Sequence, residues 1–196
     1  MKQLLTLIAA VLSFSTAFAQ IELKINPIGA IFSSPDVSAE FAVKDNIGIE
    51  PYFGASWYKL TIDNQDFKST GVGYGFYGKY YFSPEKGIDK FYAGVYLRGG
   101  SSNFKADSVG SSASFKRNRM GAGLALGYKW VSRNNVIFEV GGGIGRKLYS
   151  KYSNEQGSVN IADIPILNID GYFKFSVGYR FGGGEAADTG KKKTKF

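Results

Sequence analysis

The sequence contains no cysteine and no histidine. Without cysteine the chain can form neither disulfide bonds nor thiolate metal sites. Without histidine it lacks the usual general base of serine and cysteine hydrolases, and also the commonest zinc ligand. We therefore expect a protein that is not an enzyme and that has no cofactor, no metal site and no catalytic residues.

Long apolar runs are missing as well. Beyond the N-terminal segment, no stretch approaches the ~18 consecutive apolar residues that a transmembrane helix needs. The N-terminus combines Lys2, the apolar run Leu4–Leu12 and the small-residue site Ala17–Ala19, which together are typical of a secretory signal peptide. We expect residues 1–19 to be this signal, cleaved after Ala19, and the mature chain to leave the cytoplasm.

What the sequence does contain is glycine, with 26 residues, and aromatic side chains, which make up 16% of the chain. This mixture disfavours helices and suits strands joined by turns. From residue 20 onward, segments with a period of two residues predict eight strands. They cover residues 22–32, 35–44, 47–60, 70–82, 90–104, 114–130, 135–151 and 165–181. The remaining glycine- and lysine-rich end, residues 182–196, predicts a disordered basic tail in the periplasm.

The two faces of these segments differ in kind. In 70–82, residues such as Tyr74 and Phe76 make one face apolar, whereas glycine, tyrosine and lysine occupy the other. A soluble sandwich or lipocalin-like barrel, the alternative, would have a surface rich in charges rather than in glycine. An apolar exterior around a small, polar interior is typical of a membrane barrel. We therefore predict an all-β fold, an eight-stranded antiparallel up-and-down transmembrane β-barrel over residues 20–181.

Residues 73–78 match the G-x-G-x-x-G pattern of a dinucleotide-binding turn. That pattern has its meaning only between a buried strand and a helix. Here it lies inside a predicted strand, so we interpret Gly71, Gly73 and Gly75 as interior positions that let a narrow barrel close.

The connections between the segments predict the orientation of the barrel. With both termini in the periplasm, long outer loops are expected at 61–69, 105–113 and 152–164, as outer-membrane barrels prefer. Pro27 and Pro51 lie inside predicted strands, where the missing N–H predicts a bulge or a local break. An aromatic girdle is expected at the periplasmic rim, formed by Tyr80, Phe82, Phe91, Tyr128, Trp130, Tyr179 and Phe181.

Residues 21–181 resemble the eight-stranded outer-membrane barrels of the OmpA and OmpW type. The last segment, Lys174-Phe-Ser-Val-Gly-Tyr-Arg-Phe181, is similar to the terminal signal that such proteins present to the barrel-insertion machinery, with Ser176 where glycine is usual. The opening stretch LKINPIGAIFSSPDVSAEF is similar to an uncharacterised domain-of-unknown-function group of such barrels. The resemblance implies a bacterial outer-membrane location and contact with the insertion machinery through Lys174 to Phe181.

Charged residues on the polar face are predicted to lie inside the barrel. They are Lys24, Glu40, Glu50, Lys79, Arg98, Lys129, Glu139, Asp170, Lys174 and Arg180. Buried charges need partners, and an eight-stranded barrel is barely wide enough for its own side chains. We therefore favour a paired network that plugs the barrel. The alternative is a narrow OmpW-like channel for small or apolar solutes.

A second group of charges is predicted to lie on the outer loops. It consists of Lys116, Arg117, Arg119, Arg146 and Lys147, with Lys105 and Lys151 nearby. The chain has a net charge of +8, and for an exported protein this favours anionic outer-membrane lipid over nucleic acid as the partner. Because arginine suits phosphate groups, we expect these residues to bind lipopolysaccharide, with a generic charged rim as the alternative. The expected function is a structural or surface-interaction role for a monomer.

Overall fold

A computed structural model describes residues 20–62, 65–108, 111–154, 157–160 and 168–182. The expected signal peptide, and the expected tail beyond Gly182, lie outside the described residues. The elements are β1 (Gln20–Ile25), α2 (Pro27–Ile31), β2 (Asp36–Lys44), β3 (Ile47–Ile62), β4 (Gln65–Tyr81), β5 (Lys90–Ser108), β6 (Ser111–Val131), β7 (Val136–Asn154), β8 (Gly157–Asn160) and β9 (Ile169–Gly182).

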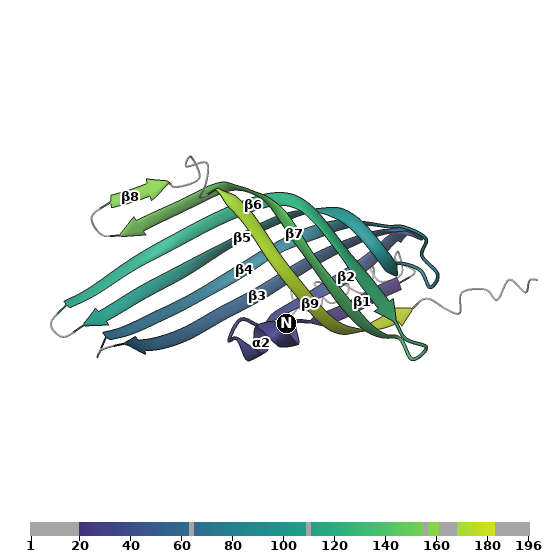
Figure 1. Ribbon diagram of the computed structural model, residues 1–196, viewed down its shortest axis with the longest axis horizontal. Helices are drawn as coiled ribbons and strands as arrows, with labels where there is room; N and C mark the ends of the chain where they lie inside the picture. Colours follow the sequence, from purple (N-terminus) through teal and green to yellow (C-terminus); the bar gives the residue numbers. More distant parts are fainter. Residues whose placement is uncertain (1–19, 63–64, 109–110, 155–156, 161–167, 183–196) are drawn as a thin grey trace, which may run out of the picture.

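Eight of the strands form a closed antiparallel ring (Figure 1). Neighbours follow the order β6-β5-β4-β3-β2-β1-β9-β7, and pairing between β6 and β7 joins the two ends. The short β8 pairs with the outer end of β7 and adds a hairpin to it. The predicted all-β, eight-stranded antiparallel barrel is confirmed. Closure pairs strand backbones on both sides and so removes the sheet edges that lipid could not solvate.

The barrel wall separates two kinds of side chain, because successive residues of a strand point to opposite faces. In β4, Tyr74 and Phe76 are 56% and 53% exposed on the outside, whereas Tyr77 and Lys79 are 6% and 2% exposed on the inside. The other strands of the ring follow the same alternation. The result is an apolar outer wall around a lumen filled with polar and aromatic side chains.

The predicted aromatic girdle is present at the end of the barrel that holds the β2–β3, β4–β5 and β6–β7 connections. Tyr80 and Phe82 pack at 5.1 Å between ring centroids, and Phe82 packs against Phe91 at 5.6 Å. The pairs Tyr128–Trp130 and Tyr179–Phe181 continue the girdle on β6 and β9, at 4.5 Å and 4.9 Å.

At the opposite end, the connections differ from the prediction because the strands continue through them. β3 runs to Ile62 and β5 to Ser108, so the long loops predicted at 61–69 and 105–113 are wrong. The connection predicted at 152–164 contains the end of β7 and all of β8. Figure 1 shows these hairpins reaching far beyond α2. Apolar and polar residues do not alternate clearly over 61–69 and 105–113, so the sequence signal of a strand is absent there.

Both prolines interrupt strand pairing, as predicted. The segment predicted as a strand over 22–32 breaks at Pro27, which begins the short helix α2. Asn26 caps this helix by accepting a hydrogen bond from the N–H of Gly29 at 2.8 Å. The helix itself was not predicted. At Pro51, which has no N–H to donate, the ladder between β2 and β3 is interrupted.

The barrel wall is short on the side of α2, because β1 ends at Ile25 while its neighbour β9 continues along the barrel axis. Ile25 is the last residue of β1 and pairs with Val177, so residues 169–176 of β9 pair with β7 alone among the described strands. The connector that contains α2 fills this side (Figure 1), and the N–H of Trp57 in β3 donates to the carbonyl of Ser33 at 2.8 Å. In the described part of the chain, no helix has the length and apolar character needed to cross a membrane.

The structure distinguishes two glycines of the G-x-G-x-x-G stretch. A Cβ atom at Gly75 would lie 2.3 Å from the carbonyl oxygen of Leu97 and 2.8 Å from Cα of Arg98. The nearest atom to a Cβ at Gly73 would be 3.9 Å away. We therefore expect Gly75→Ala to lower the free energy of unfolding by about 1–3 kcal/mol, and Gly73→Ala to change it by less than about 0.5 kcal/mol.

Urea unfolding of the refolded barrel, followed by its heat-dependent shift in gel mobility, measures both variants. Equal losses for Gly75→Ala and Gly73→Ala would show that the close approach between the backbones of β4 and β5 is not what requires glycine.

Candidate functional site

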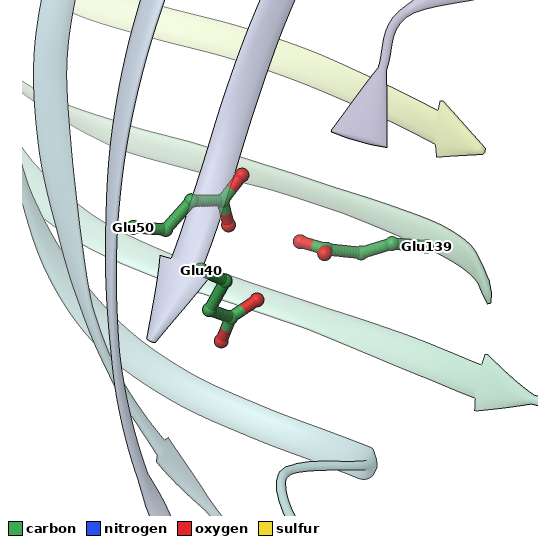
Figure 2. A group of neighbouring side chains, drawn as sticks. All are labelled: Glu40, Glu50 and Glu139. Atoms are coloured by element: carbon green, nitrogen blue, oxygen red, sulfur yellow. The ribbon is translucent and has the colours of Figure 1, made fainter. Parts of the chain in front are cut away.

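Three glutamate side chains converge in the centre of the barrel (Figure 2). Glu40, Glu50 and Glu139 come from β2, β3 and β7, are fully buried, and offer carboxylate oxygens that lie within 4.8 Å of one another. Carboxylates this close repel each other strongly when water is excluded. They can stay ionised only if cations lie among them.

Lysine ammonium groups supply this positive charge. Lys24 Nζ lies 2.5 Å from Glu40, 2.8 Å from Glu50 and 2.5 Å from Glu139. Lys79 contacts the same three carboxylates, at 3.2 Å from Glu40 and 2.6 Å from Glu139. Each glutamate is therefore shared between two lysines that are themselves fully buried.

Further ion pairs extend the network toward the end of the barrel that carries the aromatic girdle. Lys129 Nζ lies 2.8 Å from Glu40 and 2.7 Å from Glu22. Arg180 lies 2.6 Å from Glu22 and ends this row of alternating charges. Such charges are stable inside a protein only when each has a partner with good geometry, and the network provides one for every member.

Three converging carboxylates are also a candidate metal site, since oxygen ligands suit hard cations. In this protein the space among them is taken by the ammonium groups of Lys24 and Lys79, and Lys174 contacts Glu50. A metal ion would have to displace these lysines and leave their charges buried. The arrangement fits an ion-pair network better than a metal centre.

Tyrosines fill the lumen on both sides of the charges. On the outer side, the rings of Tyr77, Tyr96 and Tyr172 pack with centroids 6.5, 5.4 and 5.0 Å apart. On the periplasmic side, the hydroxyls of Tyr81 and Tyr92 donate to glutamates of the network at 2.5 Å and 2.9 Å. The charges thus lie between two aromatic layers.

The connection between β4 and β5 folds into the lumen at the end that carries the aromatic girdle. Ile88 is fully buried against Tyr81 and Tyr92. The Arg180 guanidinium donates to the backbone carbonyls of Lys86 and Ile88. This end of the barrel is therefore closed by the chain itself.

An isolated ion pair lies on the outer side of the tyrosines. Arg98 Nε and Nη2 donate to the two carboxylate oxygens of Asp170, each at 2.7 Å, and Nη2 also donates to the carbonyl of Gly171 at 2.7 Å. Tyr96 donates to the same carboxylate at 3.0 Å. A bidentate pair of this kind is geometrically specific, and it occupies Asp170 fully.

All the predicted interior charges lie inside the barrel, in the central network or in the Arg98–Asp170 pair. Sequence reasoning missed Glu22, which is fully buried and binds Lys129 and Arg180. Its interior position could have been predicted, because Glu22 lies two residues before Lys24 and therefore on the same face of β1. Burial of the β4–β5 connection had no periodic signal at all.

The basic residues predicted on outer loops lie on strands instead. Lys116, Arg117 and Arg119 belong to β6, and Arg146 and Lys147 belong to β7, so their predicted loop location is wrong. The alternation of the strands also divides them between two faces. Lys116 and Arg146 are exposed on the outer face, whereas Arg117, Arg119 and Lys147 share the inner face.

The β3–β4 hairpin carries an exposed ion pair of the ordinary kind. Lys59 Nζ lies 2.8 Å from Asp66, and the Thr61 hydroxyl donates to the same carboxylate at 2.7 Å. Hydrogen bonds from Lys59 and Thr61 lower the pKa of Asp66. Solvent screens such a pair, so it contributes little to stability.

Residues 3–165 match the family described as a protein of unknown function (DUF3575). The chain belongs to this family. The match covers most of the barrel, from the N-terminal segment to the region before β9. No curated protein matches the sequence.

The fold is similar to that of Ail, the attachment invasion locus protein of Yersinia pestis. The crystal structure of Ail in complex with the heparin analogue sucrose octasulfate has 10% sequence identity and a TM-score of 0.50, over 83% of this chain and 98% of the Ail chain. The crystal structure of Ail without this ligand has 12% identity and a TM-score of 0.47, over 84% and 99% of the two chains. At this identity the similarity concerns the fold alone.

Proposed function

We propose that this protein is an outer-membrane β-barrel with a sealed interior, and that its basic outer hairpins contact anionic groups at the cell surface. The apolar outer wall supports the membrane location. Leu124, Ile144 and Phe173 are 66%, 68% and 69% exposed on it, and hydrocarbon is the medium that would cover such side chains. The segment Lys174–Phe181, in the last strand, would present the barrel to the insertion machinery.

The filled lumen supports a role as a scaffold. A conduit needs a continuous polar path, whereas here two aromatic layers, a paired charge network and the β4–β5 connection follow one another along the axis. Small barrels of eight strands are commonly filled in this way. The activity would then lie outside the membrane, on the hairpins that extend beyond the lipid-facing wall.

The exposed cations of these hairpins carry the proposal. Lys105, Lys116 and Arg146 point outward from β5, β6 and β7, and within the described ranges none of them forms an ion pair. Unpaired cations on one surface attract a polyanion. Phosphate or sulfate groups on a saccharide, as in lipopolysaccharide, have the required charge. The complex of Ail with a heparin analogue supports the idea that this fold can present such a surface.

Binding of the refolded mature chain to immobilised lipopolysaccharide and to heparin tests this function. The variant Lys105→Gln/Lys116→Gln/Arg146→Gln is expected to bind about tenfold more weakly. Binding should also weaken as salt rises, because these charges are exposed to solvent.

Lys59→Gln is the matched control, since it removes a cation that Asp66 already neutralises. If the triple variant and the control bind polyanions equally well, the outer cations are only a charged rim and the proposed function is wrong.

A second candidate function is the passage of small or apolar solutes, and one observation favours it. An apolar groove of about 800 Å³ lies on the outer wall at the short side of the barrel, lined by residues that include Ile25, Val37, Phe53 and Val177. A solute in the membrane could enter there. To pass further it would have to displace the side chains that fill the lumen, which is why we place this candidate second.

A further inference from the structure

At the outer end of the lumen, two side chains on the inner face of the barrel each have one buried polar atom without a hydrogen-bond partner among the described residues. In the ladder between β6 and β7, Arg119 lies opposite Ser150, and Arg117 lies opposite Tyr152. Residues directly opposite each other in an antiparallel ladder point to the same face. These four side chains therefore line one small region, on the inner face that β6 shares with Lys129.

Positive charge in this region is not balanced by the described residues. The positive charges of Arg98 and Arg117 repel that of Arg119, and among the described residues the Asp170 carboxylate is the acidic side chain that opposes this repulsion. That carboxylate already accepts hydrogen bonds from Nε and Nη2 of Arg98. In the part of the chain that the structure describes, neither Arg117 nor Arg119 forms an ion pair.

Two buried polar atoms give an independent indication of a ligand. Ser150 is fully buried, and among the described residues its Oγ has no hydrogen-bond partner. Arg117 Nε is also buried without a partner in that part of the chain. Buried polar atoms in folded proteins almost always have partners, and an orphan indicates a bound water or ion. Here the orphans lie on the same face of the ladder as Arg119, so the region presents hydrogen-bond donors and an excess of positive charge.

We propose that Arg117, Arg119 and Ser150 form a pocket for one sulfate or phosphate monoester group. Guanidinium N–H groups match the geometry of tetrahedral oxyanions, and the Ser150 hydroxyl can donate one more hydrogen bond. The Arg117 guanidinium lies over the Tyr152 ring, with Arg117 Cζ 5.3 Å from the ring centroid. This contact holds the guanidinium in place. Arg119 is exposed at the opening, so the group enters from outside. The inference rests on the proposed function, because it names the ester group that the outer hairpins would recognise.

Equilibrium dialysis with radiolabelled inorganic sulfate tests the pocket, using the mature barrel in micelles of an uncharged detergent. The wild-type chain is expected to bind one sulfate. Arg117→Gln and Arg119→Gln should each weaken binding about tenfold, because each removes a charge-assisted hydrogen bond. Lys59→Gln is the matched control, since Asp66 already neutralises this cation and its side chain lies on β3, away from the ladder between β6 and β7.

Ser150→Ala separates a binding role from a structural one. Its hydroxyl has no partner among the residues that the structure describes, so its removal should leave stability unchanged or slightly raised, while sulfate binding weakens about threefold. No saturable sulfate binding, equal weakening by Lys59→Gln and Arg119→Gln, or a destabilised Ser150→Ala variant would each overturn the pocket.

Competition then distinguishes the sources of the ester. Displacement of sulfate by glucosamine 6-sulfate indicates a soluble saccharide, and displacement by lipid A micelles indicates the lipid. Displacement by neither would overturn the assignment to monoesters. Polyanion binding without sulfate binding would remove the pocket alone, whereas sulfate binding without any polyanion binding would remove the proposed function.

Discussion

Glu40→Ala is expected to lower the free energy of unfolding of the barrel by about 3–5 kcal/mol. Glu40 accepts from Lys24 at 2.5 Å, from Lys129 at 2.8 Å and from the Tyr81 hydroxyl at 2.5 Å. Removing the Glu40 carboxylate leaves the ammonium groups of Lys24 and Lys129 buried with one fewer negative partner. It also leaves the Tyr81 hydroxyl without its hydrogen-bond acceptor. Losing one member of a buried network costs far more than losing an exposed ion pair.

Urea unfolding in lipid vesicles, with the heat-dependent gel shift as the readout, measures this effect. Asp66→Ala is the control, because it removes the carboxylate of the exposed pair with Lys59, and it should change stability much less. A loss for Glu40→Ala no larger than that of the control would contradict the network as the source of stability.

A double-mutant cycle adds a second check. Lys24→Met combined with Glu40→Gln removes a cation and an anion together. The double variant should therefore lose less free energy of unfolding than the sum of the losses of the two single variants. Additive losses would mean that these two residues do not interact in the folded barrel.

The wild-type barrel is expected to show no discrete conductance steps in a planar lipid bilayer. The network of Lys24, Lys79 and the three central glutamates spans the lumen, and ion passage would require these paired charges to separate in a region of low dielectric. Tyrosine rings pack on both sides of the network. The measurement compares this protein with a large open porin under the same conditions.

A silent bilayer counts only if the inserted protein is folded, which the gel shift establishes. Discrete steps from a folded wild-type barrel would overturn the sealed lumen and favour the solute channel. In that case Lys79 and Lys129 would be the first residues to replace, since both lie on the axis of the network.

The glycine-rich stretch illustrates how far sequence reasoning reached. Alternation showed that Gly73 and Gly75 lie inside a strand, which removed the nucleotide interpretation. The requirement for glycine at Gly75, but not at Gly73, depends on how closely the backbone of β5 approaches that of β4. Nothing in a one-dimensional pattern contains that distance.

The outer hairpins show the opposite case, in which the sequence signal is absent. Lys105 lies in a strand where the sequence predicted a loop, and Lys116 lies near the start of a predicted strand, because apolar and polar residues do not alternate clearly around 105–113. The division of the basic residues between an outer and an inner face follows from strand pairing. The proposed pocket at Arg117 and Arg119 could therefore not be separated from the rim by sequence alone.

The sequence by itself determined the barrel and the facing of its wall, because apolar side chains alternate with small and polar ones along each strand. It also determined which charges are interior. Only the tertiary structure decided their partners. Lys24 meets Glu139, 115 residues away in the chain, because closure of the ring brings β1 and β7 across one lumen. Local periodicity carries no information about strand register around a closed ring, and register sets which buried charges come into contact.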